Sequence, residues 1–304
     1  MRGELSEGQL GVVLIHGIRS DARVWQPLEK CIAEDTQLDF VRTLPFEYAT
    51  GLKRLHPLRV FPSIDTAADS LKEYLVTEAG GFDRLMLITH SQGGLVAQRY
   101  LARMLADGAA HELVRIRRMV LLACPNNGSE LLRSLRQSVL GSRHPQEKDL
   151  RPISDQVTGT LRTVLRDVVN ATGLSERTCP IDIKVYAGES DGVVPAASAQ
   201  SVFPHSAVLP GDHSGILKVK TARHRTFTTL RRLMLTVPEA VPDAVSEAAP
   251  EAAPAGEARP DRPPAPRETG PGSVSNNVSG STVYGHVIQG GSVRMPGRGD
   301  DRHD

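Results

Sequence analysis

The sequence predicts an α/β fold, with a short, mostly parallel sheet of about six strands flanked by helices. Apolar runs typical of buried strands recur along the first 236 residues, and amphipathic helical patterns lie between most of them. Strands that alternate with helices favour a parallel sheet covered on both faces. The predicted strands are Gly11–Ile15, Leu38–Leu44, Arg84–Thr89, Arg118–Ala123, Ile181–Ala187 and Ser206–Leu209.

Apolar residues at helical spacing predict two of the covering helices. One apolar stripe precedes the third predicted strand and the other follows it, and each is typical of a helix that buries one face. The first stripe is Ile64, Ala67, Ala68, Leu71, Leu75 and Val76, and the second is Leu95, Val96, Tyr100, Leu101, Met104 and Leu105.

The alternation of strands and helices stops between about Gly128 and Thr178. Two helix-like stretches in this part, Ser129–Leu140 and Ile153–Asn170, predict a helical insertion over the sheet. We place the insertion after the fifth strand. A lid, a wall of a substrate pocket and a plain pair of structural helices remain open as its roles.

Charge and cysteine content exclude several classes of protein. The 36 Lys and Arg nearly cancel the 35 Asp and Glu, so no overall field attracts nucleic acid. The three cysteines, Cys31, Cys124 and Cys179, are too few and too scattered for a disulfide framework or a zinc site. The first ten residues lack the apolar core of a signal peptide, and no apolar run is long enough to span a bilayer. These features predict a cytoplasmic location.

The composition changes near Val237, where Pro, Ala and Glu become frequent. Such a segment cannot bury enough apolar surface to offset the entropy of ordering, so residues 237–272 are predicted to form a disordered linker. The sequence therefore divides into a folded domain at 1–236, this linker, a segment of different composition at 273–293 and a disordered end at 294–304.

The third predicted strand runs directly into Thr89-His90-Ser91-Gln92-Gly93-Gly94, and a helical pattern follows at once. This order of a strand, a sharp turn with a Ser, and a helix is typical of a nucleophile elbow. The turn exposes the Ser hydroxyl above the sheet, and the helix N-terminus points at the oxyanion that would develop there. Gly93 is needed if the strand and the helix cross closely. The alternative is an ordinary turn in which Ser91 caps the helix.

This segment resembles the Gly-x-Ser-x-Gly motif of the α/β-hydrolase family, with Thr89 where the first Gly is usual. The resemblance implies that Ser91 is the nucleophile. A second family feature is the strand that ends in His16-Gly17-Ile18. It implies that the backbone N–H groups of Ile18 and Gln92 form the oxyanion hole, that Gly17 lets the backbone approach the substrate, and that His16 holds the loop in place.

The family order of catalytic residues is nucleophile, acid, then His. The strand Ile181–Ala187 leads into a turn in which Asp191 matches the acid, with Glu189 as a competitor and a simple turn Asp as the alternative. After the last strand, His213 lies in a Gly-flanked loop and matches the general base.

The other polar residues near these positions have weaker sequence contexts. His205 is the main rival base, but it precedes the last strand. Asp212 is expected to be solvated, and the remaining histidines are expected to serve packing or to lie at the surface. These histidines are His56, His90, His111, His144 and His224.

A further segment, Cys124-Pro125-Asn126-Asn127-Gly128-Ser129, resembles a Thr-Pro-His-x-Gly-Ser stretch of lipase-like hydrolases related to inositol deacylases of GPI lipids. Cys124 replaces the Thr of that stretch, and Asn126 replaces the His. The resemblance adds lipids to the candidate substrates.

Residues 273–293 combine β-branched residues with Asn and Gln, contain glycines that divide them into strand-sized pieces, and carry almost no charge. Such pieces can stack in register as a fibril. Asn-Asn-Val-Ser-Gly, Val-Tyr-Gly-His-Val-Ile-Gln and Gly-Gly-Ser-Val resemble bacterial amyloid signalling motifs related to the RIP homotypic interaction motif. The resemblance implies, as partner, an oligomerising receptor with a matching motif. A disordered low-complexity end is the alternative.

Together these features predict a serine esterase or lipase that forms an acyl-enzyme, uses no metal or organic cofactor, and acts as an effector recruited by its tail. The substrate would be a carboxylic ester or a lipid, and the cytoplasmic enzyme could be recruited to a membrane surface. The alternatives are an inactive interaction protein and an acyltransferase with the same three catalytic residues. Epoxide and haloalkane hydrolysis are disfavoured because they need an Asp where this chain has Ser91.

Overall fold

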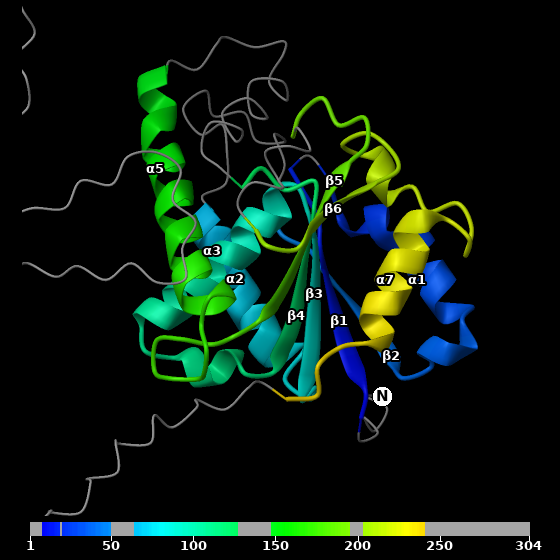
Figure 1. Cartoon of the computed structure of the whole chain (residues 1–304), viewed down its shortest axis with the longest axis horizontal. Helices are drawn as coiled ribbons and strands as arrows, with labels where there is room; N and C mark the ends of the chain where they lie inside the picture. Colours follow the sequence, from blue (N-terminus) through cyan, green and yellow to red (C-terminus); the bar gives the residue numbers. More distant parts are fainter. Residues whose placement is uncertain (1–7, 19, 50–63, 127–146, 195–202, 241–304) are drawn as a thin grey trace, which may run out of the picture. The chain divides into compact units, whose positions relative to one another are not determined.

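Six parallel strands form the centre of the molecule in the order β2-β1-β3-β4-β5-β6 (Figure 1). The computed structural model describes residues 8–18, 20–49, 64–126, 147–194 and 203–240, and side chains at 147–154 are not described. The predicted α/β fold is confirmed. The strands are β1 (Leu10–Ile15), β2 (Val41–Phe46), β3 (Arg84–His90), β4 (Ile116–Leu122), β5 (Asp182–Gly188) and β6 (Ser206–Leu209).

Most strand boundaries differ from the sequence prediction by one to three residues, and two of the differences have local reasons. The second strand begins at Val41 instead of Leu38, because Thr36–Leu38 forms a 3-10 turn (η2) whose N-cap, Asp35, accepts a hydrogen bond from the N–H of Gln37. The fourth strand extends from Ile116 to Leu122 and does not include Ala123, which has a left-handed φ of 49°.

Helices cover both faces of the sheet, with α2, α3 and α5 on one face and α1 and α7 on the other (Figure 1). The α-helices are α1 (Gln26–Ala33), α2 (Ile64–Thr77), α3 (Gln92–Ala106), α5 (Glu147–Val164) and α7 (Arg225–Leu235). The other short helical segments are η1 (Ala22–Trp25), η3 (Ala110–Leu113), η4 (Leu165–Val169) and η5 (Gly215–Leu217).

The core has two halves because successive strand residues point to opposite faces. Val13 of β1 belongs to the apolar cluster under α2 and α3, whereas Val12 belongs to the cluster under α1 and α7. The predicted stripe on α2 is buried except for Val76, which is 57% exposed. The prediction for Val76 is wrong because Leu75 already occupies the buried stripe and the next residue is rotated away by about 100°.

The insertion follows β4, the fourth strand, and not the fifth as predicted. Only β1, β2 and β3 precede β4 in the described part of the chain. The predicted helix at Ser129–Leu140 lies outside the described residues. The second predicted helix, Ile153–Asn170, corresponds to α5, which begins earlier at Glu147, and to the π-helical turn η4.

Several described side chains of the insertion belong to the core of the domain. Val157, Val164 and Val168 are buried in the same apolar cluster as α2 and α3. At the surface, Asp65 of α2 accepts hydrogen bonds from Arg99 Nε of α3 and Gln156 Nε2 of α5, each at 2.6 Å. The carboxylate of Asp65 therefore links the three helices on this face.

Several sequence assignments lie wholly or partly outside the described residues. The segment that resembles inositol deacylases is described only from Cys124 to Asn126. The predicted amyloid-type motif and the disordered end are outside, as is the predicted linker from residue 241 onward.

Candidate active site

Ser91 lies in a sharp turn between β3 and α3. Its backbone has φ of 51°, a left-handed value that L-residues rarely adopt. The Ser91 N–H donates to the carbonyl of Leu122 at 2.9 Å, which ties the turn to the neighbouring strand. A Cβ at Gly93 would lie 2.5 Å from the carbonyl oxygen of His16, so the helix leaves the turn too close to β1 for any side chain there. The local geometry is that of a nucleophile elbow.

The structure brings Ser91, His213 and Asp191 into one chain of contacts. His213 Nε2 lies 3.0 Å from Ser91 Oγ, and His213 Nδ1 lies 3.0 Å from Asp191 Oδ2. A carboxylate only accepts hydrogen bonds, so Nδ1 carries a proton and, in the neutral ring, Nε2 faces the hydroxyl as an acceptor. The hydroxyl of Ser91 therefore donates to His213.

Asp191 is held in a fixed orientation by its backbone surroundings. Its side chain is 0% exposed, and Oδ1 accepts from the N–H groups of Val193 (2.8 Å) and Val194 (2.9 Å). Burial raises the pKa of Asp191, but the interactions with His213 and with the backbone N–H groups of Val194 and Val193 together outweigh burial and leave the pKa below its usual value. Asp191 is therefore a carboxylate at neutral pH.

Two adjacent loops carry the acid and the base. The loop after β5 leads to Asp191, and the loop after β6 leads to His213. Hydrogen bonds between backbone groups join these two loops. Glu189 N–H donates to the carbonyl of Leu209 (2.8 Å), and Ser190 N–H donates to the carbonyl of Gly211 (3.1 Å). The distance between Asp191 and His213 is therefore set by the backbone.

The loop after β1 approaches the nucleophile closely. A Cβ at Gly17 would lie 2.9 Å from Ser91 Cβ, so only Gly fits. His16 is fully buried, its Nδ1 donates to the Gly17 carbonyl at 3.0 Å, and its ring stacks on Tyr48 at 4.6 Å between centroids. Burial lowers the pKa of His16 and favours the neutral ring. The sequence predicts that His16 holds this loop in place, and this role remains a prediction.

The predicted oxyanion donors flank the nucleophile on two segments. Gln92 is the first residue of α3, where backbone N–H groups have no acceptor within the helix. Ile18 follows Gly17 and packs against the apolar core. Both remain predictions as oxyanion donors.

The weaker candidates for the acid and the base are exposed or make other contacts. His205 is exposed and precedes β6, where its carbonyl accepts from Val185 N–H at 3.0 Å. Asp212 is exposed, as expected, and its Oδ1 accepts from the N–H groups of Ser214 and Gly215. His111 is exposed, and His224 caps α7, whereas His56 and His144 lie outside the described residues.

His90 makes a contact at the site that the sequence analysis did not predict. Its Nε2 lies 2.7 Å from the backbone carbonyl of His213, so it donates a hydrogen bond to the residue that carries the base. Burial, and then the nearby His213, lower the pKa of His90 to about 4, so the ring is neutral. Its position directly before Ser91 was the available signal.

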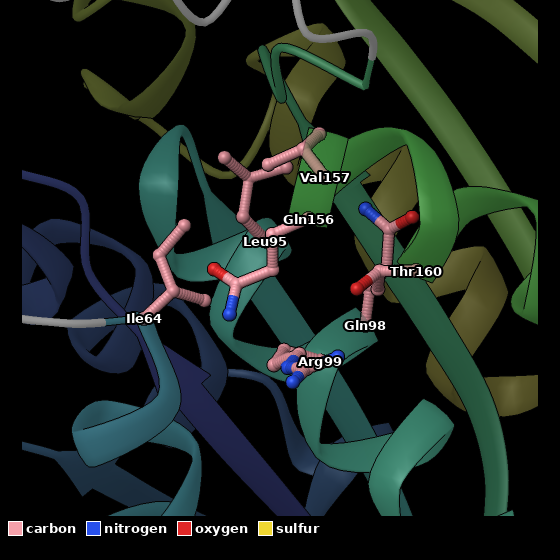
Figure 2. A pocket seen from close by; sticks show the side chains of 7 residues that line it. All are labelled: Ile64, Leu95, Gln98, Arg99, Gln156, Val157 and Thr160. Carbon is pink, nitrogen blue, oxygen red and sulfur yellow. The ribbon is translucent and has the colours of Figure 1, made fainter. Parts of the chain in front are cut away.

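The described part of the insertion leaves little space beside the elbow helix. Figure 2 shows a crevice lined by Leu95 and Gln98 of α3 and by Val157 and Thr160 of α5. Its volume is about 10 Å³, which is roughly the room that one water molecule needs. An acyl chain does not fit between these two helices.

The sequence matches one known protein family over most of its length. The match is to the alpha/beta hydrolase family and covers residues 12–271. The chain therefore belongs to the α/β-hydrolase family, and a hydrolase is the general class of protein that this membership supports. No curated protein matches the sequence. No helix among the described residues is both long and apolar enough to cross a membrane.

Two solved structures of a phospholipase share the fold at low sequence identity, and further structures match less well. Phospholipase PlaB from Legionella pneumophila, in complex with thio-NAD, is 17% identical with a TM-score of 0.56, over 76% of this chain and 59% of that chain. A second structure of this phospholipase is 15% identical with a TM-score of 0.52, over 76% and 60%. This chain thus spans about three fifths of the phospholipase. Haloalkane dehalogenase DbeA from Bradyrhizobium elkani USDA94 is 11% identical with a TM-score of 0.49, over 76% and 92%.

Proposed function

We propose that the protein is a serine hydrolase that cleaves carboxylic esters. The observation that carries the proposal is the unbroken chain from Ser91 Oγ through the His213 ring to the buried Asp191 carboxylate, with both contacts at 3.0 Å. A neutral Ser is a poor nucleophile, and a base held in one tautomer by a carboxylate activates it.

In the proposed reaction, Ser91 Oγ attacks the ester carbonyl while His213 Nε2 takes the hydroxyl proton. The imidazolium that forms is stabilised by Asp191, and it then protonates the departing alcohol. Water deprotonated by His213 hydrolyses the acyl-enzyme and releases the carboxylic acid. The N–H groups of Ile18 and Gln92 would bind the oxyanion in both steps, a role supported by the close approach of the Gly17 loop to Ser91.

Lipid esters are the proposed substrate class. Support comes from the fold shared with a phospholipase and from the Cys124–Asn126 segment, which resembles lipase-like hydrolases. The small crevice between α3 and α5 is not the proposed acyl site.

A fluorophosphonate probe tests the proposed nucleophile. We expect the probe to label the folded full-length protein, and labelling to disappear in Ser91→Ala. Ser190→Ala, which removes another Ser near the acid, is the matched control and should be labelled like the wild type. A folded wild type that resists labelling would refute the proposed chemistry and favour an inactive interaction protein.

The substrate class is tested with nitrophenyl esters of increasing chain length, followed by a panel of lipids. We expect kcat/KM to rise with acyl length and the activity to disappear in Ser91→Ala. Transfer of the acyl group to an added alcohol in preference to water would instead favour an acyltransferase.

We further propose that residues 273–293 recruit the enzyme as an effector of an oligomerising receptor with a matching motif. Support comes from the composition of this segment and its separation from the domain by the predicted linker. The protein would act in the cytoplasm and reach a membrane surface through this assembly. A peptide of residues 273–293 should form thioflavin-positive fibrils, and Val287→Asp should abolish them. A peptide that stays soluble at high concentration would contradict this role.

A further inference from the structure

A hollow of about 650 Å³ lies at the end of the sheet opposite the catalytic residues. It is bounded by the second half of α2, by η3 and by the residues that lead into β3 and β4. Ser91 follows the far end of β3, which at about 3.3 Å per residue places the hollow roughly 20 Å from it. The volume is in the range of small-molecule sites, about 300–1,000 Å³.

Arg117 lines this hollow and lies at an irregularity in the sheet. Leu85 of β3 pairs with Ile116, but the next residue, Met86, pairs with Arg118. Arg117 is therefore the extra residue of a β-bulge, a feature that is rare in parallel pairs and that redirects a side chain.

The guanidinium of Arg117 lacks the partners that its neighbours have. Arg115 donates to the carbonyls of Ala79 and Leu75 at the end of α2, and Arg118 pairs with the carboxylate of Asp182. By contrast, Arg117 Nε and Nη1 are enclosed and have no hydrogen-bond partner among the described residues.

The enclosed charge of Arg117 is not compensated by its surroundings. Burial lowers its pKa more than the nearby Cys179 raises it, and the positive charge of Arg84 lowers the pKa further. A cation in such a place is stabilised when an anion approaches it.

The lining of the hollow indicates the kind of anion. The lining contains Lys72, Arg115 and Arg117 together with two carboxylates, so these five groups carry an excess of one positive charge. A monoanion matches this charge better than a doubly charged phosphate does. The two carboxylates are Asp83 and Glu112.

The hollow also offers apolar surface. Phe82 and Val114 belong to its lining, and so does Val76, whose exposure of 57% is unusual for a large apolar side chain. An aliphatic body would cover Val76 while its carboxylate approaches the guanidinium of Arg117 from the hollow, through Nη2, which is not among the enclosed nitrogen atoms.

We propose that this hollow binds an aliphatic carboxylate, with Arg117 as the residue that holds the carboxylate group. The site is separate from Ser91, so the proposal does not depend on the proposed ester hydrolysis. An Arg and a carboxylate form charge-assisted hydrogen bonds, which are stronger than those between neutral groups.

Calorimetric titration of the full-length protein with octanoate tests the proposal. We expect saturable binding to the wild type and binding weaker by about tenfold or more in Arg117→Gln. Arg117→Lys keeps the charge and should retain most of the affinity. Arg223→Gln removes an exposed Arg elsewhere and should bind as the wild type does. Octanol and inorganic phosphate should both bind more weakly than octanoate.

Fluorophosphonate labelling of Ser91 should be the same in Arg117→Gln and in the wild type, which separates this site from the catalytic one. The proposal is overturned if the wild type shows no saturable binding of octanoate. It is also overturned if a folded Arg117→Gln binds octanoate as tightly as the wild type, since the carboxylate would then lie elsewhere.

Discussion

The two ends of the parallel sheet use their polar residues in opposite ways. At the carboxyl end, Ser91, Asp191 and His213 are far apart in the sequence, yet they meet in one chain of hydrogen bonds. At the amino end, Arg117 and Arg118 are adjacent in the sequence but differ in partners, since Arg118 is paired and Arg117 is not. The candidate catalytic site is recognised because residues distant in the sequence contact one another there. The candidate ligand site is recognised because Nε and Nη1 of the Arg117 guanidinium have no hydrogen-bond partner among the described residues.

The largest effect is expected for Asp191→Asn at the carboxyl end. An amide can donate to His213 Nδ1 and so favours the wrong tautomer, and we expect kcat to fall by about 10³–10⁴-fold with the fold retained. The measurement is kcat and KM on a nitrophenyl ester, with circular dichroism to check folding. Glu189 is the competing carboxylate, and Glu189→Gln should leave kcat nearly unchanged. Loss of activity in Glu189→Gln with an active Asp191→Asn would show that Glu189 orients the base.

At the amino end, Arg118→Met should reduce stability more than activity. Arg118 is 6% exposed and donates to Asp182, to the carbonyl of Leu233 and to Thr236, so Met leaves buried acceptors without a partner. We expect the free energy of unfolding to fall by about 3 kcal/mol, measured in urea, while labelling of Ser91 in the folded protein persists. Lys184 Nζ also lies 2.7 Å from Asp182 Oδ1, and equal stability of variant and wild type would show that this contact alone satisfies Asp182.

Local sequence patterns were sufficient to predict the candidate catalytic residues. Ser91, Asp191 and His213 each occupy a loop directly after an apolar strand, and parallel strands bring such loops to the same edge. The strand pattern likewise predicted the fold class, because few folds other than a parallel sheet covered by helices accommodate buried strands that alternate with amphipathic helices.

Contacts between distant segments could not be predicted in the same way. The hydrogen bond from His90 to the carbonyl of His213 joins residues 123 positions apart, so the position of His90 before Ser91 places it at the site but does not indicate which atom it contacts. The bulge at Arg117 depends on the register between β3 and β4. The start of the second strand was missed because the Asp35 cap favours a turn over an extended apolar run.

His90 should make stability depend on pH. Its pKa falls from 6.5 to about 4 on folding, so the unfolded state takes up the proton first. The stabilisation is complete above pH 6.5 and is lost progressively as the pH falls toward 4. Between pH 7 and pH 5 we expect the wild type to lose about 2 kcal/mol relative to His90→Gln, in parallel urea titrations. Parallel pH profiles of the two proteins would contradict the neutral, buried state of His90.

His90→Phe should slow catalysis by about tenfold in kcat, because the carbonyl of His213 loses its donor and the base is less well positioned. Gln places an amide nitrogen at a similar reach, so His90→Gln should recover most of the rate. The measurement is kcat against KM on a short nitrophenyl ester, where a positioning role lowers kcat and leaves KM nearly unchanged. Equal rates in the Phe and Gln variants would show that the donor is dispensable.

The smallest effect is expected for Arg117→Gln in the absence of any added carboxylate. Its comparison with Arg118→Met tests whether these two arginines at the amino end of the sheet contribute differently to stability. Removing a charge whose Nε and Nη1 have no partner breaks no hydrogen bond, so the free energy of unfolding should change by less than about 0.5 kcal/mol or should rise. With saturating octanoate, the wild type should gain stability over the variant, because a ligand that binds only the folded state stabilises it. Urea titrations with and without octanoate measure both quantities. A large loss of stability without ligand would mean that Arg117 has a structural role like that of Arg118.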